Sequence, residues 1–105
     1  MPTPLTKRQT ALARHALGLP NERRHAFRNW FVAGPGHADY DDWMAMTGLG
    51  YAVRRDGRQQ PFGGSHLFRL TRAGAGAALL ARESYDPLNF PVDIGETALG
   101  RDVNN

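Results

Sequence analysis

The sequence contains no cysteine, which excludes a disulfide framework, a thiolate zinc site and a thiol nucleophile. It also lacks any apolar run near the roughly 18 residues that a membrane-spanning helix requires. Residues 1–10 are polar and include Lys7 and Arg8, so they lack the apolar centre of a secretory signal. We therefore expect a cytoplasmic protein in a reducing compartment, without membrane association.

Groups suited to catalysis are equally scarce. Ser65 and Ser84 stand outside any Gly-x-Ser-x-Gly frame, and no two histidines are spaced as a ligand or catalytic pair. The glycine pairs are not followed by the lysine of a phosphate-binding loop. These absences predict a protein that is not an enzyme and that needs no cofactor.

The stretch His37-x-Asp39-x-Asp41-Asp42 has two interpretations. Histidine and aspartate at this spacing are possible ligands of a divalent metal. The same acids also suit the start of a helix, where free N–H groups and the helix dipole favour negative charge. The second interpretation explains every residue without a metal, and we favour it.

Charge is distributed unevenly along the 105 residues, a length typical of one domain. Residues 1–82 carry twelve Lys and Arg against five Asp and Glu, a net charge of +7. Residues 83–105 carry one Arg against five acids, a net charge of −4. A basic body with an acidic arm indicates a surface that faces a polyanion and an arm able to fold back on that body. Eleven of the twelve cations in the body are arginine, which suits forked contacts with phosphate.

Local patterns predict the order of elements. Thr6 and Gln9 form a capping-box pattern ahead of an amphipathic helix over residues 7–17, which Gly18 ends. A short strand over residues 29–33 should place Trp30 and Phe31 in the core. A helix within residues 37–50, capped by Asp39, and a hairpin over residues 51–55 and 65–70 should follow. The last expected elements are a helix over residues 72–82, anchored by Leu79 and Leu80, and an arm over residues 83–105 whose apolar residues show no sustained period.

The end of the hairpin carries a motif of its own. Leu70, Thr71 and Gly74 match the Leu-Thr-x-x-Gly pattern with which the second wing strand enters a helix, and the region resembles the wing of MarR-type winged-helix regulators. The resemblance implies that the threonine caps the last helix, that the glycine allows close packing on the wing, and that the protein binds DNA. We therefore expect an α+β, winged-helix-like domain over residues 1–82, followed by an irregular acidic arm over 83–105.

The pattern also departs from that family. The position of the first of the two helix-turn-helix helices, residues 21–36, holds a short apolar strand and Gly34-Pro35-Gly36 instead. The recognition-helix position begins with Asp39, Asp41 and Asp42, which would repel phosphates. As a whole, residues 5–80 resemble small phage or prophage proteins with a "HALGL … RN-F-VAGPG" layout.

Two groups of arginines are the predicted binding residues. The wing group comprises Arg54, Arg55, Arg58 and Arg69. The second group, Arg23, Arg24 and Arg28, lies next to Trp30 and Phe31, a combination that suits stacking of unpaired bases. The expected partner is DNA. The alternative is a phage-encoded inhibitor of a host complex that handles nucleic acid, such as a CRISPR surveillance assembly, with Asp39, Asp41, Asp42 and the acidic arm, or the arginines, making the contacts.

Overall fold

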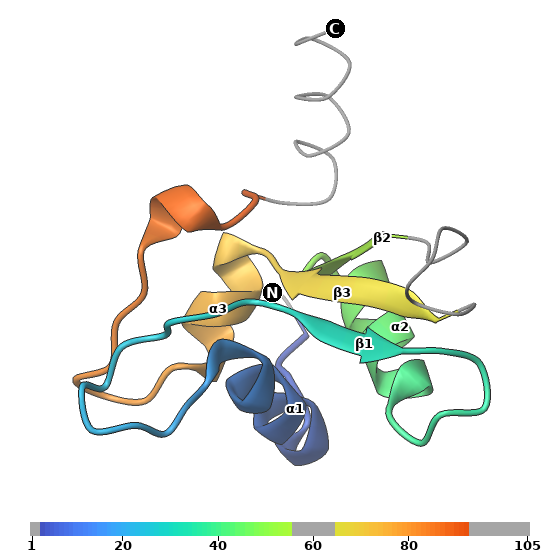
Figure 1. Cartoon of the computed structure of the whole chain (residues 1–105), viewed down its shortest axis with the longest axis horizontal. Helices are drawn as coiled ribbons and strands as arrows, with labels where there is room; N and C mark the ends of the chain where they lie inside the picture. The colour runs from blue at the N-terminus through green and yellow to red at the C-terminus, as the bar shows by residue number, and fades with distance from the viewer. Residues whose placement is uncertain (1–2, 56–64, 93–105) are drawn as a thin grey trace, which may run out of the picture.

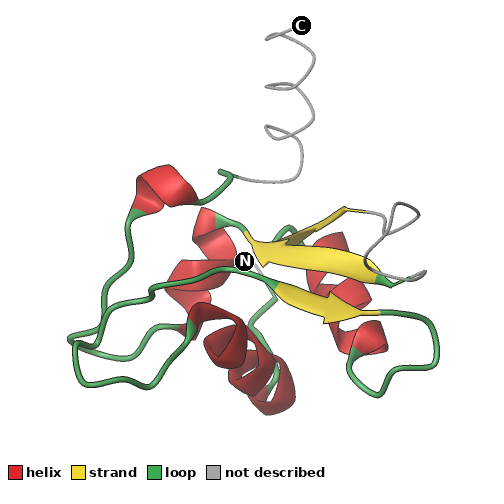
Figure 2. Cartoon of the chain, viewed as in Figure 1, coloured by secondary structure: helices red, strands yellow, loops and turns green. Residues whose placement is uncertain are grey.

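The computed structural model of the chain describes residues 3–55 and 65–92. These residues form a helix, a short strand, a second helix, an antiparallel hairpin and a third helix, which is the predicted α+β order (Figures 1 and 2). In chain order the elements are α1 (Lys7–Leu17), β1 (Phe31–Ala33), α2 (Tyr40–Gly48), β2 (Ala52–Arg55), β3 (His66–Leu70), α3 (Arg72–Ala78) and the short 3₁₀ helix η1 (Pro87–Asn89).

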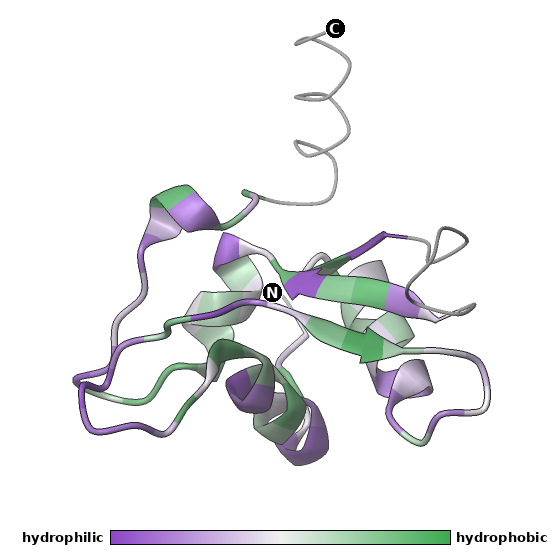
Figure 3. Ribbon diagram, in the orientation of Figure 1, coloured by the Kyte–Doolittle hydropathy of each residue, from purple (hydrophilic) through white to green (hydrophobic). Residues whose placement is uncertain are grey.

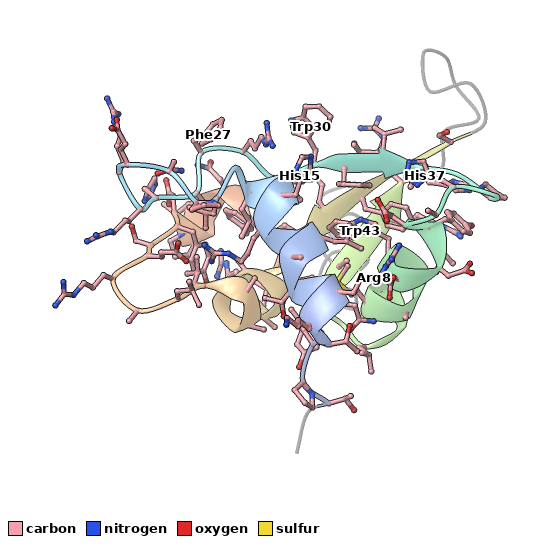
Figure 4. The ribbon with its side chains drawn as sticks, turned by 90° about the horizontal axis from the view of Figure 1, so that it is seen from below. Arg8, His15, Phe27, Trp30, His37 and Trp43 are labelled. Carbon is pink, nitrogen blue, oxygen red and sulfur yellow. The ribbon has the colours of Figure 1, made fainter. Side chains whose placement is uncertain are left out.

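The three strands form one antiparallel sheet in the order β1-β3-β2. Phe68 in β3 stands opposite both Phe31 in β1 and Arg54 in β2. Successive side chains of a strand point to opposite faces, so Phe68 and its neighbour Arg69 lie on different faces of the sheet. The helices α1, α2 and α3 cover the face that carries Phe68, and none of the described helices covers the other (Figures 1 and 4). We call the uncovered side the open face of the sheet.

Aromatic rings fill the space between the sheet and the helices. Trp43 of α2 is fully buried and stacks on Phe68 with 5.5 Å between the ring centroids. The ring of Phe31 lies 5.2 Å from Trp43, and Leu17 of α1 closes the core beside them. Figure 3 shows the corresponding pattern, with β1 hydrophobic and α1 divided into a hydrophilic and a hydrophobic side. Burial of these large apolar side chains is the main force that holds the helices against the sheet.

The first helix begins and ends where the sequence predicts. The hydroxyl of Thr6 accepts from the N–H of Gln9, the amide oxygen of Gln9 accepts from the N–H of Thr6, and both distances are 3.0 Å. Gly18 follows the helix with φ of +80°, in the left-handed region that glycine adopts without strain. The capping box and the glycine stop are therefore confirmed.

The Leu-Thr-x-x-Gly segment also performs the local roles expected of it. The hydroxyl of Thr71 accepts from the N–H of Gly74 at 3.1 Å and donates to the carbonyl of Gly50 at 2.8 Å. A Cβ on Gly74 would collide with the carbonyl oxygen of Tyr51, next to the start of β2. Thr71 thus caps α3, and Gly74 lets this helix approach the hairpin closely.

Two helix details differ from the sequence prediction. Asp39 precedes α2 but makes no side-chain capping hydrogen bond, because its carboxylate binds Arg8 instead. The last helix ends at Ala78 rather than at residue 82, since Leu79 takes an extended conformation. Leu79 packs against the core as predicted, but Leu80 lies beyond the helix and is 62% exposed, so its predicted anchoring role is wrong.

Residues 83–92, the described part of the acidic arm, pack against the body. Ser84 forms a parallel bridge with His25, and Phe90 is buried with its ring 4.9 Å from that of Tyr85. Glu83 forms an ion pair with Arg14 of α1. The rest of the arm, residues 93–105, lies outside the described residues.

Candidate nucleic-acid interface

The alternation of β2 separates the two wing arginines that are adjacent in sequence. Arg54 stands opposite the buried Phe68 and donates to the sulfur of Met44 in α2 at 3.5 Å, so it lies on the helix side of the sheet. Arg55 stands opposite Leu67, is exposed, and lies on the open face. Arg58 lies outside the described residues. The described members of the predicted wing group therefore lie on two faces of the sheet, with Arg54 on one and Arg55 on the other.

Arg69 lies on the open face in the central strand. It is exposed and stands opposite Val53 of β2. One guanidinium nitrogen of Arg69 donates to the backbone carbonyl of Asn89 at 2.9 Å, which ties η1 to the sheet. A guanidinium group has five N–H donors, so this single bond leaves most of them free to bind an anion.

The segment before β1 presents two exposed aromatic rings. Trp30 is 54% exposed and Phe27 is 67% exposed. Figure 4 shows both side chains on the same side of the molecule, pointing away from α1. The prediction that Trp30 belongs to the core is wrong. Phe31 packs against Trp43 on the helix side, and side-chain alternation then turns Trp30 toward solvent.

Arg28 lies between these rings in sequence and is held in place by two contacts. Its guanidinium donates to the carbonyl of His15 at 2.8 Å, and the guanidinium carbon lies 5.4 Å from the centre of the Phe27 ring. The second contact has the geometry of a cation–π interaction. Arg28 is therefore pre-positioned beside Phe27 on the same surface.

Arg23 and Arg24 lie in the loop between α1 and β1. Both are exposed, and neither side chain makes a hydrogen bond or ion pair within residues 3–55 and 65–92. The loop itself is fixed, because the amide of Asn21 donates to the carbonyls of Gly18 and His25 at 3.0 and 2.9 Å. A fixed backbone with free guanidinium groups suits electrostatic attraction of a polyanion.

Together these residues define one candidate surface. We call it the aromatic–arginine surface, and its members are Phe27, Arg28, Trp30, Arg55 and Arg69. It combines stacking rings with cations at the open face and its border. Sequence reasoning missed the exposure of Trp30 and Phe27. Alternation next to the half-buried Phe31 could have revealed the exposure of Trp30, whereas Phe27, four residues before Phe31, carries no such signal.

The acidic side chains at the start of α2 bind groups within the chain. Arg8 of α1 binds Asp39 at 2.8 Å and Asp42 at 2.6 Å, and it also donates to the carbonyl of Ala38 at 3.1 Å. The ring of His37 accepts from the backbone N–H of Asp39 at 3.0 Å. Arg8 and the helix start thus account for these residues, and the part of the chain that the structure describes has no cluster of three or more possible metal ligands.

No family model matches this chain, and neither the curated proteins nor the solved structures include a significant match. In the described ranges, every helix is too short or too polar to cross a bilayer.

Proposed function

We propose that the chain is a nucleic-acid-binding protein that makes contact through the aromatic–arginine surface. The observation that carries the proposal is the placement of Trp30, Arg55 and Arg69 on or beside an open sheet face. Cations release counterions when they bind phosphates, and exposed rings stack on bases. Exposed aromatics next to arginines offer both sources of affinity.

The resemblance of the hairpin and the last helix to the wing of MarR-type regulators supports the same proposal. The hairpin pairs with β1 through its second strand, and Thr71 and Gly74 fulfil the roles that the MarR-type motif implies. The helix α2 has no basic side chain, and both Asp39, just before it, and Asp42, in its first turn, bind Arg8. We therefore propose that contact is made by the wing and the open face rather than by α2 in a major groove.

The test is fluorescence anisotropy with short mixed-sequence duplex and single-stranded DNA at several salt concentrations. Arg55→Gln removes one cation from the proposed surface, and Lys7→Gln removes one exposed cation from α1 as a matched control. Arg55→Gln should weaken binding and lower the slope of log affinity against log salt by about 0.9 for duplex DNA. Lys7→Gln should change the slope much less. Equal effects of the two variants, or no binding by the wild type at low salt, would contradict the proposal.

A second candidate function is inhibition of a phage-defence complex that handles nucleic acid. It is supported by the exposed side chains of Phe27, Trp30 and Leu88, the last of which is 85% exposed. Aromatic residues and arginine are enriched at the energetic centres of protein interfaces. Binding to a purified CRISPR surveillance complex, without affinity for free DNA at low salt, would favour this function over the first.

A further inference from the structure

Two hollows that share Phe27 as a lining residue lie at the border of the aromatic–arginine surface. The first has a volume of about 390 Å³, and the second about 370 Å³. Phe27 and His25 line both of them. The volumes lie within the range of about 300–1,000 Å³ that is typical of small-molecule sites.

The backbone around Phe27 holds its ring in this exposed position. A Cβ on Gly18 would collide with the ring, so the left-handed glycine that ends α1 also provides the space the ring occupies. The N–H of Phe27 donates to the carbonyl of Leu17 at 3.2 Å, and Arg28 contacts the ring. A phenylalanine that is exposed yet fixed from several sides has the character of a preformed stacking platform.

Each hollow is lined by the ring of Phe27, by at least one arginine, and by polar side chains of the kind that hydrogen-bond the edge of a base. The first contains Arg28, Arg69, Asp86 and Asn89. The carboxylate of Asp86 accepts from the N–H of Leu88 at 3.1 Å and from the side-chain amide of Asn89 at 3.3 Å. A carboxylate has about four acceptor positions, so these two bonds leave capacity for a third donor such as the amino group of a base.

The second hollow has the same kinds of groups with different residues. It contains Arg23, whose side chain makes no hydrogen bond or ion pair in the described parts of the chain, together with Asn21 and Glu22. The guanidinium can bind a phosphate, and the carboxylate of Glu22 can accept from the edge of a base, while the amide of Asn21 is already bound to Gly18 and His25.

We infer that two adjacent unpaired bases of a single-stranded nucleic acid bind against Phe27, one in each hollow, while Arg28 and Arg23 bind their phosphates. The inference rests on the proposed function and narrows its ligand to unpaired nucleotides. A duplex keeps its bases stacked on each other, so it cannot place them around Phe27 without unstacking.

The experiment compares Phe27→Leu with Phe27→Tyr by anisotropy on a labelled oligodeoxyadenylate and on a duplex of the same length. Leucine keeps an apolar contact at Gly18 but removes the aromatic faces, whereas tyrosine keeps them. Phe27→Leu should weaken single-strand binding roughly 5- to 150-fold, the range expected for loss of stacking on a base. Phe27→Tyr should bind close to wild type, and duplex affinity should change little in either variant.

A second arm uses the wild-type protein and does not depend on the folding of a variant. This arm uses a strand in which every segment long enough to span the site contains two adjacent abasic positions. The wild-type protein should bind that strand as weakly as Phe27→Leu binds the unmodified strand. Competition by free adenosine monophosphate as strong as that by the strand, at equal nucleotide concentration, would overturn the inference in favour of a free-nucleotide site.

The outcomes separate this inference from the proposed function. Salt-sensitive binding that is equal for single strand and duplex, and unchanged in Phe27→Leu, would overturn the two-base site while leaving nucleic-acid binding intact. Absence of any binding at low salt would overturn both.

Discussion

The ion pair between Arg14 and Glu83 should make folding stability depend on acid pH. The two terminal guanidinium nitrogens of Arg14 bind the two carboxylate oxygens of Glu83 at 2.5 and 2.7 Å. The side chains are only 13% and 6% exposed, and the N–H of Leu80 also donates to Glu83 at 2.6 Å. The hydrogen bonds from Arg14 are the main reason that the pKa of Glu83 falls from 4.5 to about 2. This pair fixes residues 83–92, which contribute Asp86 and Asn89 to the first hollow.

The sign of the pH effect follows from the lowered pKa. Glu83 binds a proton more readily in the unfolded chain than in the folded one, so its stabilising contribution is complete above pH ~4.5 and is lost as the pH falls toward about 2. The shift corresponds to at most about 3 kcal/mol, and partial solvent screening reduces the expected contribution to about 2 kcal/mol. More than half of this contribution should be gone at pH ~3.

The assay is urea unfolding followed by circular dichroism at neutral pH and at pH ~3, with wild type, Glu83→Gln and the control Glu22→Gln. At neutral pH, Glu83→Gln should lower the free energy of unfolding by about 2–4 kcal/mol, because Arg14 loses its charged partner. At pH ~3 the difference from wild type should shrink by about 1–2 kcal/mol, because the wild type loses more than half of the contribution of the ion pair. Glu22 is exposed and its removal should matter little. A Glu83→Gln deficit that is the same at both pH values would refute the assignment of this stability to the ion pair.

Two further predictions concern packing and exposure. Gly74→Ala should lower the free energy of unfolding by about 1–3 kcal/mol, because the added methyl group meets the carbonyl of Tyr51. Gly76→Ala has open space around the added methyl group and should raise the free energy of unfolding by about 0.5–1 kcal/mol. Thermal melts that rank the two variants in the opposite order would contradict this packing. Trp30 is exposed and Trp43 is fully buried, so acrylamide should quench wild-type fluorescence strongly and that of Trp30→Phe weakly; equal quenching of both proteins would place the exposed ring elsewhere.

Local rules were sufficient for the parts of the fold that depend on neighbours in sequence. The start and end of α1 follow from Thr6, Gln9 and Gly18, and the start of α3 follows from Thr71 and Gly74. Each of these features is a hydrogen bond or a close approach whose cause lies in the residue types themselves. The order of the elements could therefore be predicted correctly from the sequence.

The candidate site depends on contacts between residues that are far apart in the sequence, and local sequence rules do not predict such contacts. Alternation requires that Arg54 and Arg55 point to opposite faces, but only the pairing of β2 with Phe68 decides which of them faces the helices. The exposure of Trp30 likewise depends on Phe31 being the ring that meets Trp43. Asp86 and Asn89 reach the site because residues 83–92 pack back on the body; the charge pattern suggested such packing, but it did not indicate which residues would meet.

The contacts of the predicted binding arginines divide them into two groups. Of the seven predicted binding arginines, Arg28, Arg54 and Arg69 make internal contacts. Arg23, Arg24 and Arg55 are exposed and make no hydrogen bond or ion pair in residues 3–55 and 65–92, and Arg58 lies outside those ranges. The three internal contacts go to backbone carbonyls or to a thioether sulfur, so they fix these arginines in place without neutralising their charge.

The ion pairs that Arg8 forms with Asp39 and Asp42 weaken the main objection to nucleic-acid binding. Three aspartates near the start of α2 would repel phosphates if they were free. Arg8 binds two of them, so one guanidinium offsets part of that negative charge, and the acids lie at the end of α2 beside α1 rather than on the open face. Repulsion from Asp39 and Asp42 therefore opposes a duplex that approaches along α2 but has little effect on a strand that lies across Trp30 and Phe27. The distribution of charge and the distribution of exposed rings independently favour the same side of the molecule.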